Sequence, residues 1–352
     1  MENIKKLTGG KKIAAIIGIA IAAIILLLLI AVLCLHLFTP LVFNGFFSNA
    51  KEEYVIPGLL DGVVPQGYAY VGENEVYLMC GYMANGESAS RIYITDAEKT
   101  DKTYYVELYT ADGKPYTGHT GGLTSAFGFV WLANDGEGND NRVWVMKLAD
   151  ILTAKNGDKI ILETSFQTES RAACCFVDGK YLWVGEFNDG EKYVTKETHT
   201  FNVSNGENKA LVCAYALDID SKYGIASAKV DGKDIFTPKL ALSVTDLVQG
   251  FTRTPSGFAL STSYGINPSH LYIYDDVTVG DPDASLEVNG IDVPVYFLDS
   301  DSLTKDVVTP PMSEEIFVKD GRLYVLYESA CQKYIFGNLI RGRHVYSYDL
   351  TK

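Results

Sequence analysis

Two stretches of this sequence have the same form although they lie near opposite ends of the chain. They are "PQGYAYVGENEVYLMCGY" at residues 65–82 and "SEEIFVKDGRLYVLYES" at residues 313–329. Each contains a short apolar strand, a turn with Gly, Asn or Asp, and a second strand rich in aliphatic and aromatic residues. Three further copies begin at Gly121, Ala172 and Gln249. Repetition at a spacing of roughly 50 to 75 residues indicates a repeat architecture.

Further strand patterns, rich in Val, Ile, Tyr and Phe, follow each copy. Third strands are expected to begin at Arg91, Arg142, Ala210, His270 and His344. Fourth strands are expected from Thr103, Lys159 and Ile225, and then at either residues 294–299 or residues 306–310. Units of four strands are typical of the blades of a β-propeller. The sequence therefore predicts an all-β, five-bladed β-propeller preceded by a single N-terminal transmembrane helix.

The last repeat ends at Asp349, directly after its third strand. Residues 53–60 form a strand pattern that belongs to no complete unit. We expect this segment to pair with the final blade and close the ring, because closure removes an exposed sheet edge. Two insertions, residues 188–209 and 277–292, are either specificity loops or surface elaboration.

Residues 13–35 contain no charged side chain. A helix of that length covers about 35 Å, which is enough to cross a bilayer core of about 30 Å. Four lysines precede the run, so the positive-inside rule places the amino terminus in the cytoplasm. This predicts a cytoplasmic tail (1–12), a transmembrane helix (13–38), a linker (39–52) and an extracytoplasmic propeller (53–352) in a single-pass plasma-membrane protein. The alternative is secretion after cleavage of a signal peptide near residues 48–50.

The charge of the chain is divided unequally between its two parts. Residues 1–50 carry four Lys and one Glu, a net charge of +3, so the total of −14 leaves −17 for the remainder. Such a domain repels phosphate backbones, and nucleic acid is not expected as a partner. It should also be held off an anionic membrane surface. The sequence contains no nucleophile elbow, zinc-protease motif or phosphate-binding glycine loop, so neither a metal nor a cofactor is expected.

In a propeller, the first residues of the innermost strands meet at one mouth of the central channel. This geometry gathers six candidate ligand-binding residues: Gln66, His119, Arg171, Gln249, Glu314 and Glu315. Candidate acids or bases are His119, Glu314, Glu186 and Glu328, the last two at the ends of second strands. Strand alternation predicts that only one of Glu314 and Glu315 faces the channel. The alternative is a structural channel whose polar residues are bridged by water.

The blade openings "PQGY", "GHTGG", "VQGF" and "MSEEI", with "RLYVLYESACQKY" near the end, resemble those of bacterial membrane-anchored or secreted β-propeller proteins of unassigned activity. The resemblance covers residues 60–350 and implies an architecture, because fold alone does not select a reaction. The expected function is recognition of a small molecule, glycan or envelope protein at the channel mouth by a surface-displayed binding or scaffold protein. Alternatives are an extracytoplasmic hydrolase of a carbohydrate or lactone, and a structural component of an envelope complex.

Overall fold

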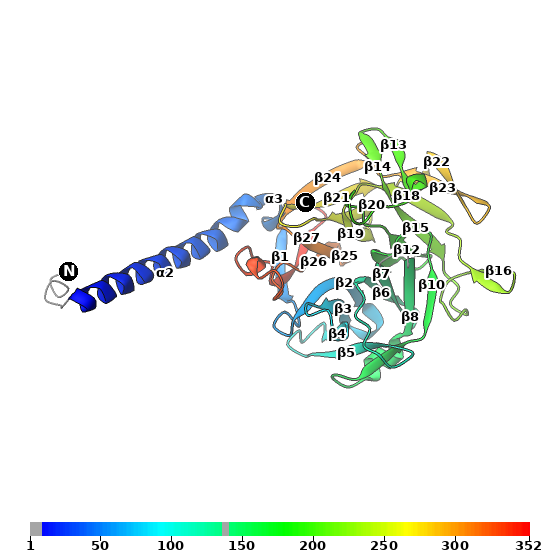
Figure 1. Cartoon of the computed structure of the whole chain (residues 1–352). Coiled ribbons are helices and arrows are strands. Elements are labelled where there is room, and N and C mark those ends of the chain that lie inside the picture. The colour runs from blue at the N-terminus through cyan, green and yellow to red at the C-terminus, as the bar shows by residue number, and fades with distance from the viewer. Residues whose placement is uncertain (1–8, 136–140) are drawn as a thin grey trace.

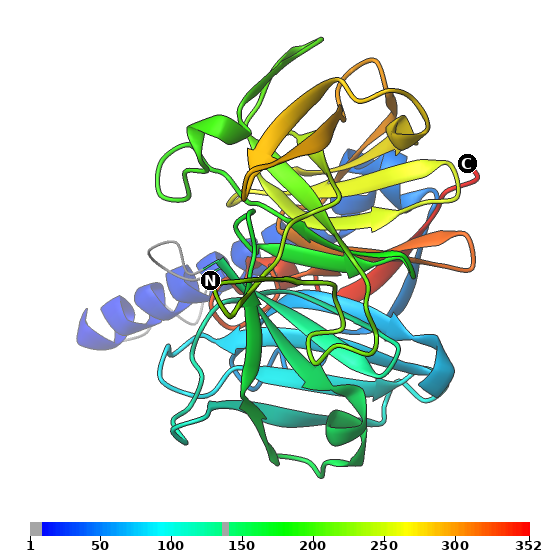
Figure 2. The same ribbon diagram turned by 90° about the vertical axis from the view of Figure 1, so that its right-hand side faces the viewer.

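The apolar, β-branched and aromatic segments of the repeat form antiparallel hairpins that assemble into five large sheets around one axis (Figure 1). The computed structural model describes residues 9–135 and 141–352. The predicted cytoplasmic tail therefore lies partly outside the described residues. Figure 2 shows the red strands of the last sheet between the cyan strands of the first and the yellow strands of the fourth. The chain is a five-bladed β-propeller preceded by one long apolar helix, as predicted.

The strands of each blade follow one another outward from the axis. The first blade contains, from the inside, β2 (Val63–Val71), β3 (Val76–Met83), β4 (Arg91–Asp96), β5 (Thr103–Thr110) and β9 (Lys159–Leu162). The second contains β6 (Thr120–Ala126), β7 (Phe129–Asp135), β8 (Asn141–Lys147) and β10 (Thr164–Gln167). The third contains β11 (Cys174–Val177), β12 (Tyr181–Gly185), β15 (Ala210–Ala216), β18 (Leu240–Val244), β23 (Ile291–Phe297) and β22 (Ala284–Val288).

The fourth and fifth blades have four strands each. They contain β19 (Val248–Arg253), β20 (Gly257–Thr262), β21 (Ser269–Asp275) and β24 (Leu303–Thr309), then β25 (Ser313–Lys319), β26 (Arg322–Tyr327), β27 (His344–Asp349) and β1 (Ala50–Val55). Two small hairpins, β13–β14 (Phe201–Val203, Gly206–Asn208) and β16–β17 (Ala228–Val230, Lys233–Ile235), project from the third blade, and α4 (Leu148–Thr153) follows β8.

The predicted closure of the ring is confirmed. β1 pairs antiparallel with β27, from Ala50 opposite Tyr348 to Val55 opposite His344. The strand begins and ends earlier than the predicted segment, residues 53–60. It ends before Pro57, which has no N–H to donate, and Gly58, whose φ of +73° suits glycine.

Two of the predicted fourth strands are wrong. The segment at Lys159 forms β9, which pairs in parallel with β5 of the first blade, and β10 completes the second blade. The segment at Ile225 leads into the β16–β17 hairpin, and β18 completes the third blade. Of the two alternatives for the fourth blade, residues 306–310 lie at the end of β24, whereas residues 294–299 lie largely in β23 of the third blade. Outer strands thus cover the edges of neighbouring blades, which protects those edges from pairing with other chains.

Apolar side chains between neighbouring blades hold the ring together. Leu78 of β3 and Leu132 of β7 are fully buried in one such cluster, between the first and second blades. Trp183 of β12 and Phe258 of β20 pack edge to face between the third and fourth blades, with ring centroids 5.8 Å apart. Full burial of a large apolar side chain stabilises by about 1.5–3 kcal/mol. The interfaces between blades therefore form the hydrophobic core.

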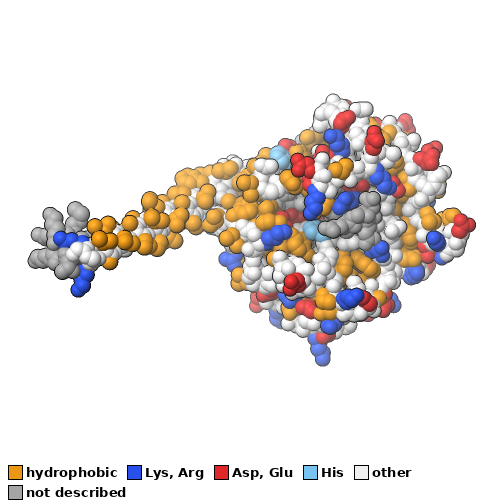
Figure 3. Space-filling model, viewed as in Figure 1, with side chains coloured by type: hydrophobic (Ala, Val, Ile, Leu, Met, Phe, Trp, Pro, Cys, Tyr) orange, Lys and Arg blue, Asp and Glu red, His pale blue; other side chains and the backbone are white. Residues whose placement is uncertain are grey.

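The apolar helix α2 (Gly9–Val42) leads into α3 (Asn44–Phe47) and then into β1. Within the described residues it is the one helix long and apolar enough to cross a bilayer, and no part of its most apolar segment is buried. Figure 3 shows apolar side chains along the helix beyond the basic residues at its N-terminal end, in contrast to the mixed charges on the propeller. An isolated helix that is apolar on all sides is compatible with a membrane anchor or a signal sequence.

Candidate functional site

A β-bulge recurs where the innermost strands open toward one mouth of the channel. The register between first and second strands shifts after Pro65, Thr120, Val248 and Ser313, in four of the five blades. A bulge places two residues opposite one and redirects the side chains there. It therefore explains how Gln66 and Gln249 reach the mouth although the flanking strand positions bury apolar residues.

Glu314 and Glu315 were predicted to point to opposite faces of a regular strand, but they lie in a β-bulge. Strict alternation does not hold across the bulge, and each of the two side chains is only 1% exposed. Glu315 reaches across the axis, where its two oxygens accept hydrogen bonds from the backbone N–H of Cys175 (3.5 Å) and Phe251 (3.3 Å). Burial raises the pKa of Glu315, and these N–H donors oppose that rise. One carboxylate thus joins the innermost strands of the third, fourth and fifth blades.

Gly122 makes this central contact sterically feasible. A Cβ at this position would lie 2.6 Å from the Oε2 atom of Glu315 and 2.6 Å from the backbone nitrogen of Cys175. Because glycine has no Cβ, the innermost strands of the second and third blades can approach both each other and the carboxylate. The centre of the ring is therefore closely packed.

Glu314 is the other residue of the bulge and has no hydrogen-bond partner on either carboxylate oxygen within the described part of the chain. Burial, followed by the charges of Glu328 and Glu315, raises its pKa well above the usual value. Glu328 follows β26 and accepts a hydrogen bond from Nε2 of Gln66 (2.9 Å). Burial also raises the pKa of Glu328, to about 7. Two neighbouring carboxyl groups therefore have a higher proton affinity than free glutamate.

A cavity of about 460 Å³ opens above these acids, and we call it the mouth pocket. All five blades contribute to its lining, which combines a polar floor with aromatic walls. We use floor for the polar lining residues Gln66, His119, Gln249, Ser263 and Glu328, and wall for the aromatic lining residues Tyr82, Phe187, Tyr193, Tyr264 and Tyr334 with Lys333; Ala173, Gly265 and Met312 complete the lining. The volume lies within the range of small-molecule sites, about 300–1,000 Å³.

His119 lies in the floor against the ring of Tyr82, with ring centroids 4.9 Å apart. Its Nδ1 atom is buried and has no hydrogen-bond partner within the described residues. Burial, together with the positive charges of Lys333, Lys192 and Arg171, lowers the pKa of this histidine to about 4. A neutral imidazole is the result at neutral pH, with one nitrogen available to a ligand.

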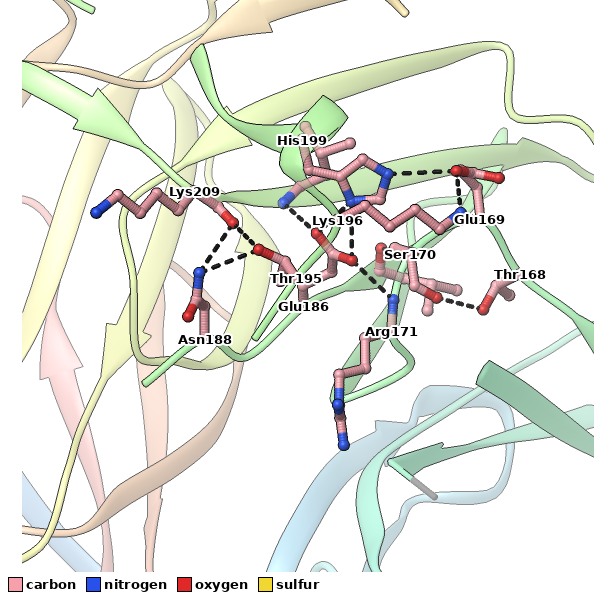
Figure 4. A network of polar contacts seen from close by, with 12 residues as sticks. Thr168, Glu169, Ser170, Arg171, Glu186, Asn188, Thr195, Lys196, His199 and Lys209 are labelled. Carbon is pink, nitrogen blue, oxygen red and sulfur yellow. Dashed lines mark hydrogen bonds and ion pairs between the residues drawn. The ribbon is translucent and has the colours of Figure 1, made fainter. Parts of the chain in front are cut away.

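Arg171 and Glu186 do not line the mouth pocket. They belong to a polar network beside it, in the third blade (Figure 4). Glu186 accepts hydrogen bonds from the backbone N–H of Arg171 (3.0 Å) and Leu211 (3.0 Å) and lies 2.9 Å from Nδ1 of His199. The guanidinium of Arg171 lies 4.9 Å from the ring centre of Tyr193, in the pocket wall.

His199 occupies the centre of this network and is fully buried. Its Nε2 atom lies 3.3 Å from Glu169, which also contacts Lys196. Although burial favours the neutral ring, hydrogen bonds to Glu169 and Glu186 raise the pKa of His199 to about 9. The charged imidazole therefore fixes the insertion of the third blade to the ring, and this insertion carries Tyr193 into the mouth pocket. The candidate acid Glu186 has a structural role in this arrangement.

The structure brings Gln66, His119, Gln249 and Glu328 together in one pocket, with Glu314 and Glu315 buried at the centre of the ring. The sequence reasoning missed the aromatic wall. A signal for it was present, because three of the five repeat copies end in an aromatic residue within two residues of the end of the second strand, at Tyr82, Phe187 and Tyr264. In residues 9–135 and 141–352, no three His, Cys, Asp or Glu side chains are grouped so as to hold a metal ion.

No protein-family model matches this chain, and no curated protein sequence matches it either. Among solved structures, BamB from Moraxella catarrhalis is similar at 9% identity and a TM-score of 0.33, covering 82% of this chain and 85% of that one. An exo-β-1,3-galactanase from Phanerochaete chrysosporium has 11% identity and a TM-score of 0.42, covering 82% and 59%. The Dos1 propeller has 10% identity and a TM-score of 0.31, covering 80% and 71%. At these values the likeness is one of fold alone.

Proposed function

We propose that this protein is a membrane-anchored, extracytoplasmic binding protein whose mouth pocket recognises a saccharide. The observation that carries the proposal is the composition of that pocket, in which aromatic rings from four blades surround amide, hydroxyl, imidazole and carboxyl groups. A pyranose ring has apolar C–H faces that pack on aromatic rings and hydroxyl groups that require hydrogen-bond partners. Apolar walls with a few convergent polar groups provide both.

The anchor and its orientation are supported by the long apolar helix and the four lysines that precede its charge-free run. An α-helix of 34 residues measures about 51 Å, which exceeds the bilayer core. In this orientation the propeller lies outside the cytoplasm, where extracellular glycans are accessible.

Binding is better supported than hydrolysis. Glycoside hydrolysis by paired acids requires two carboxyl groups about 5–10 Å apart on either side of the scissile bond. Among the described residues, Glu328 is the one carboxyl group that lines the mouth pocket, whereas Glu314 is buried outside the lining and Glu186 is engaged by His199. The raised pKa of Glu328 is the observation that keeps hydrolysis as a second candidate, because a protonated carboxyl group can act as a general acid.

Calorimetric titration of the full-length protein in detergent with neutral and acidic mono- and oligosaccharides tests the proposal. Tyr264→Ala should weaken binding of the saccharide that is found, because Tyr264 is 48% exposed and forms part of the pocket wall. Phe127→Ala is the matched control, since Phe127 is 47% exposed and lies outside the pocket. Equal affinity in both variants, or no binding by any saccharide, would contradict the proposal. Release of reducing ends that Glu328→Gln abolishes would favour the hydrolase.

A further inference from the structure

The connection between β26 and β27 differs in charge from the rest of the propeller. After Glu328, which is buried at its start, residues 330–343 contain Lys333, Arg341 and Arg343 and neither Asp nor Glu, and His344 begins β27. The chain beyond residue 50 carries a net charge of −17, so this segment is a local exception. Two acids act on this segment: Glu328 interacts electrostatically with Lys333, and Glu52 lies 3.3 Å from His344. A basic segment on an acidic domain suits an anionic partner.

The same connection also exposes apolar side chains. Ile335 is 66% exposed and has a φ of +41°. A β-branched residue rarely adopts this left-handed conformation, and such outliers persist where the surrounding structure enforces them. Leu60, which is 81% exposed, lies beside the connection, because Nε2 of Gln332 donates a hydrogen bond to the carbonyl oxygen of Leu60 (2.6 Å). Basic and apolar groups therefore share one surface.

This surface lies next to the outer end of α2. Nε of Arg341 donates a hydrogen bond to the carbonyl oxygen of His36 (3.2 Å), one residue beyond the charge-free run that ends at Leu35. Phe46 of α3 is fully buried and stacks on Tyr348 of β27, with ring centroids 5.9 Å apart. Figure 1 shows the red connection on the side of the propeller from which α2 leaves. The packing of α3 therefore sets the orientation of the surface toward the anchor.

We propose that residues 330–343, together with Leu60, rest on the anionic headgroup surface of the membrane that α2 anchors. If α2 crosses the bilayer, its charge-free run ends at the level of the headgroups, and Arg341 lies at that level. Basic residues near a membrane are attracted to anionic lipids, and exposed Ile and Leu side chains enter the interface. The inference rests on the membrane anchor that forms part of the proposed function.

The net negative charge of the propeller predicts repulsion from an anionic membrane, but this basic surface would be a local exception. Charges further from the membrane than about 8 Å are largely screened at physiological salt, so the charge of the nearest loop dominates. The same connection supplies Lys333 and Tyr334 to the mouth pocket, where Nζ of Lys333 donates a hydrogen bond to the hydroxyl oxygen of Tyr82 (2.7 Å). Contact with the membrane would therefore hold the pocket close to the bilayer surface.

Fluorescence of the full-length protein in lipid nanodiscs tests the proposal. An environment-sensitive thiol probe is attached at Ile335→Cys in a Cys34→Ser background, since the five other cysteines are buried. Val230→Cys is the matched control, because Val230 is 53% exposed and lies on β16, far from α2 in Figure 1. With phosphatidylglycerol present, the probe at Ile335→Cys should shift its emission to the blue and resist quenching by iodide. Nitroxide on the lipid headgroups should quench it, and the control probe should remain in water.

Arg341→Gln combined with Arg343→Gln, or replacement of the anionic lipid by phosphatidylcholine, should reduce nitroxide quenching at Ile335→Cys. A separate sample labelled at Cys34 reports on the anchor. If Cys34 is protected by lipid while the Ile335→Cys probe is as accessible to iodide as the control, the surface proposal is wrong and the anchor stands. If Cys34 is also accessible, the anchor itself fails. Protection of Ile335→Cys in native membranes but not in nanodiscs would assign the surface to an envelope protein and overturn the lipid proposal.

Discussion

Replacement of Glu328 by glutamine should stabilise the protein, and more so as the pH rises. In the folded state, burial raises the pKa of Glu328 from 4.5 to about 7. The folded state therefore holds the proton more tightly than the unfolded chain does. The stability associated with this proton is fully present below about pH 4.5 and is lost as the pH rises through 7. At about 1.4 kcal/mol per pH unit, complete ionisation destabilises the folded state by about 3 kcal/mol.

The glutamine of the Glu328→Gln variant cannot ionise, yet its amide oxygen still accepts the hydrogen bond that Gln66 donates to Glu328. We therefore expect Glu328→Gln and the wild type to have similar free energies of unfolding near pH 4.5. Near pH 8.5 the variant should be more stable by up to about 3 kcal/mol. Urea denaturation in detergent, followed by the fluorescence of the buried Trp131 and Trp183, measures the difference at each pH.

Glu186→Gln is the matched control, because Glu186 also follows the second strand of a blade and is likewise buried. It differs in its partners, since it accepts two backbone hydrogen bonds and pairs with His199. Its replacement should destabilise at neutral pH, because it removes one partner of a buried charge. A Glu328→Gln variant that is less stable at high pH, or a difference that does not change with pH, would refute this account of the acid pair.

Three further changes probe other parts of the chain, each measured as a free energy of unfolding in urea. His199→Gln should destabilise by about 3 kcal/mol below pH 6.5, and the loss should shrink as the pH rises through 9, because the pKa of His199 is raised to about 9; a constant loss would contradict a charged role. Gly122→Ala should destabilise by about 1–3 kcal/mol or more, because its Cβ would lie 2.6 Å from the backbone of the next blade; Gly280→Ala, whose Cβ would lie 3.7 Å from the carbonyl oxygen of Val277, an ordinary van der Waals contact, should be nearly neutral. Phe46→Ala should cost about 3–5 kcal/mol and Phe47→Ala less; equal losses would argue against docking of α3 on the last blade.

The number of blades and the closure of the ring could be predicted from the sequence because both depend on local patterns. Each hairpin shows its own pattern of apolar residues and its own turn. The last repeat ends at Asp349 after three strands, and a strand pattern just before the first blade supplies the fourth. The partners of the outer strands could not be predicted. β9 and β23 have ordinary strand patterns, and each pairs in parallel with an edge that lies beside it only after the ring forms. Strand propensity reports a fit to a sheet and does not identify which sheet.

The candidate site shows the same division between local and nonlocal information. The sequence identified polar residues at the blade openings, because position within a repeat fixes position around the axis. It did not reveal the bulges at which Gln66 and Gln249 reach the mouth pocket, because a bulge is a property of two paired strands. It also did not reveal that the candidate acid Glu186 contacts His199. His199 lies in an insertion that no other repeat contains, so position within the repeat could not place it.

The two buried glutamates at the centre of the ring, Glu315 and Glu314, differ in their hydrogen-bond partners. Glu315 accepts hydrogen bonds from backbone N–H groups of the third and fourth blades and so acts as a structural bridge across the axis. Glu314 has no such donors within the described chain, and the negative charge of Glu328, which lines the mouth pocket, contributes to its raised pKa. An unsatisfied buried group of this kind destabilises the folded state by about 1–3 kcal/mol. A ligand that accepts a hydrogen bond from protonated Glu328 should bind more weakly as the pH rises through 7, because Glu328 then loses that proton.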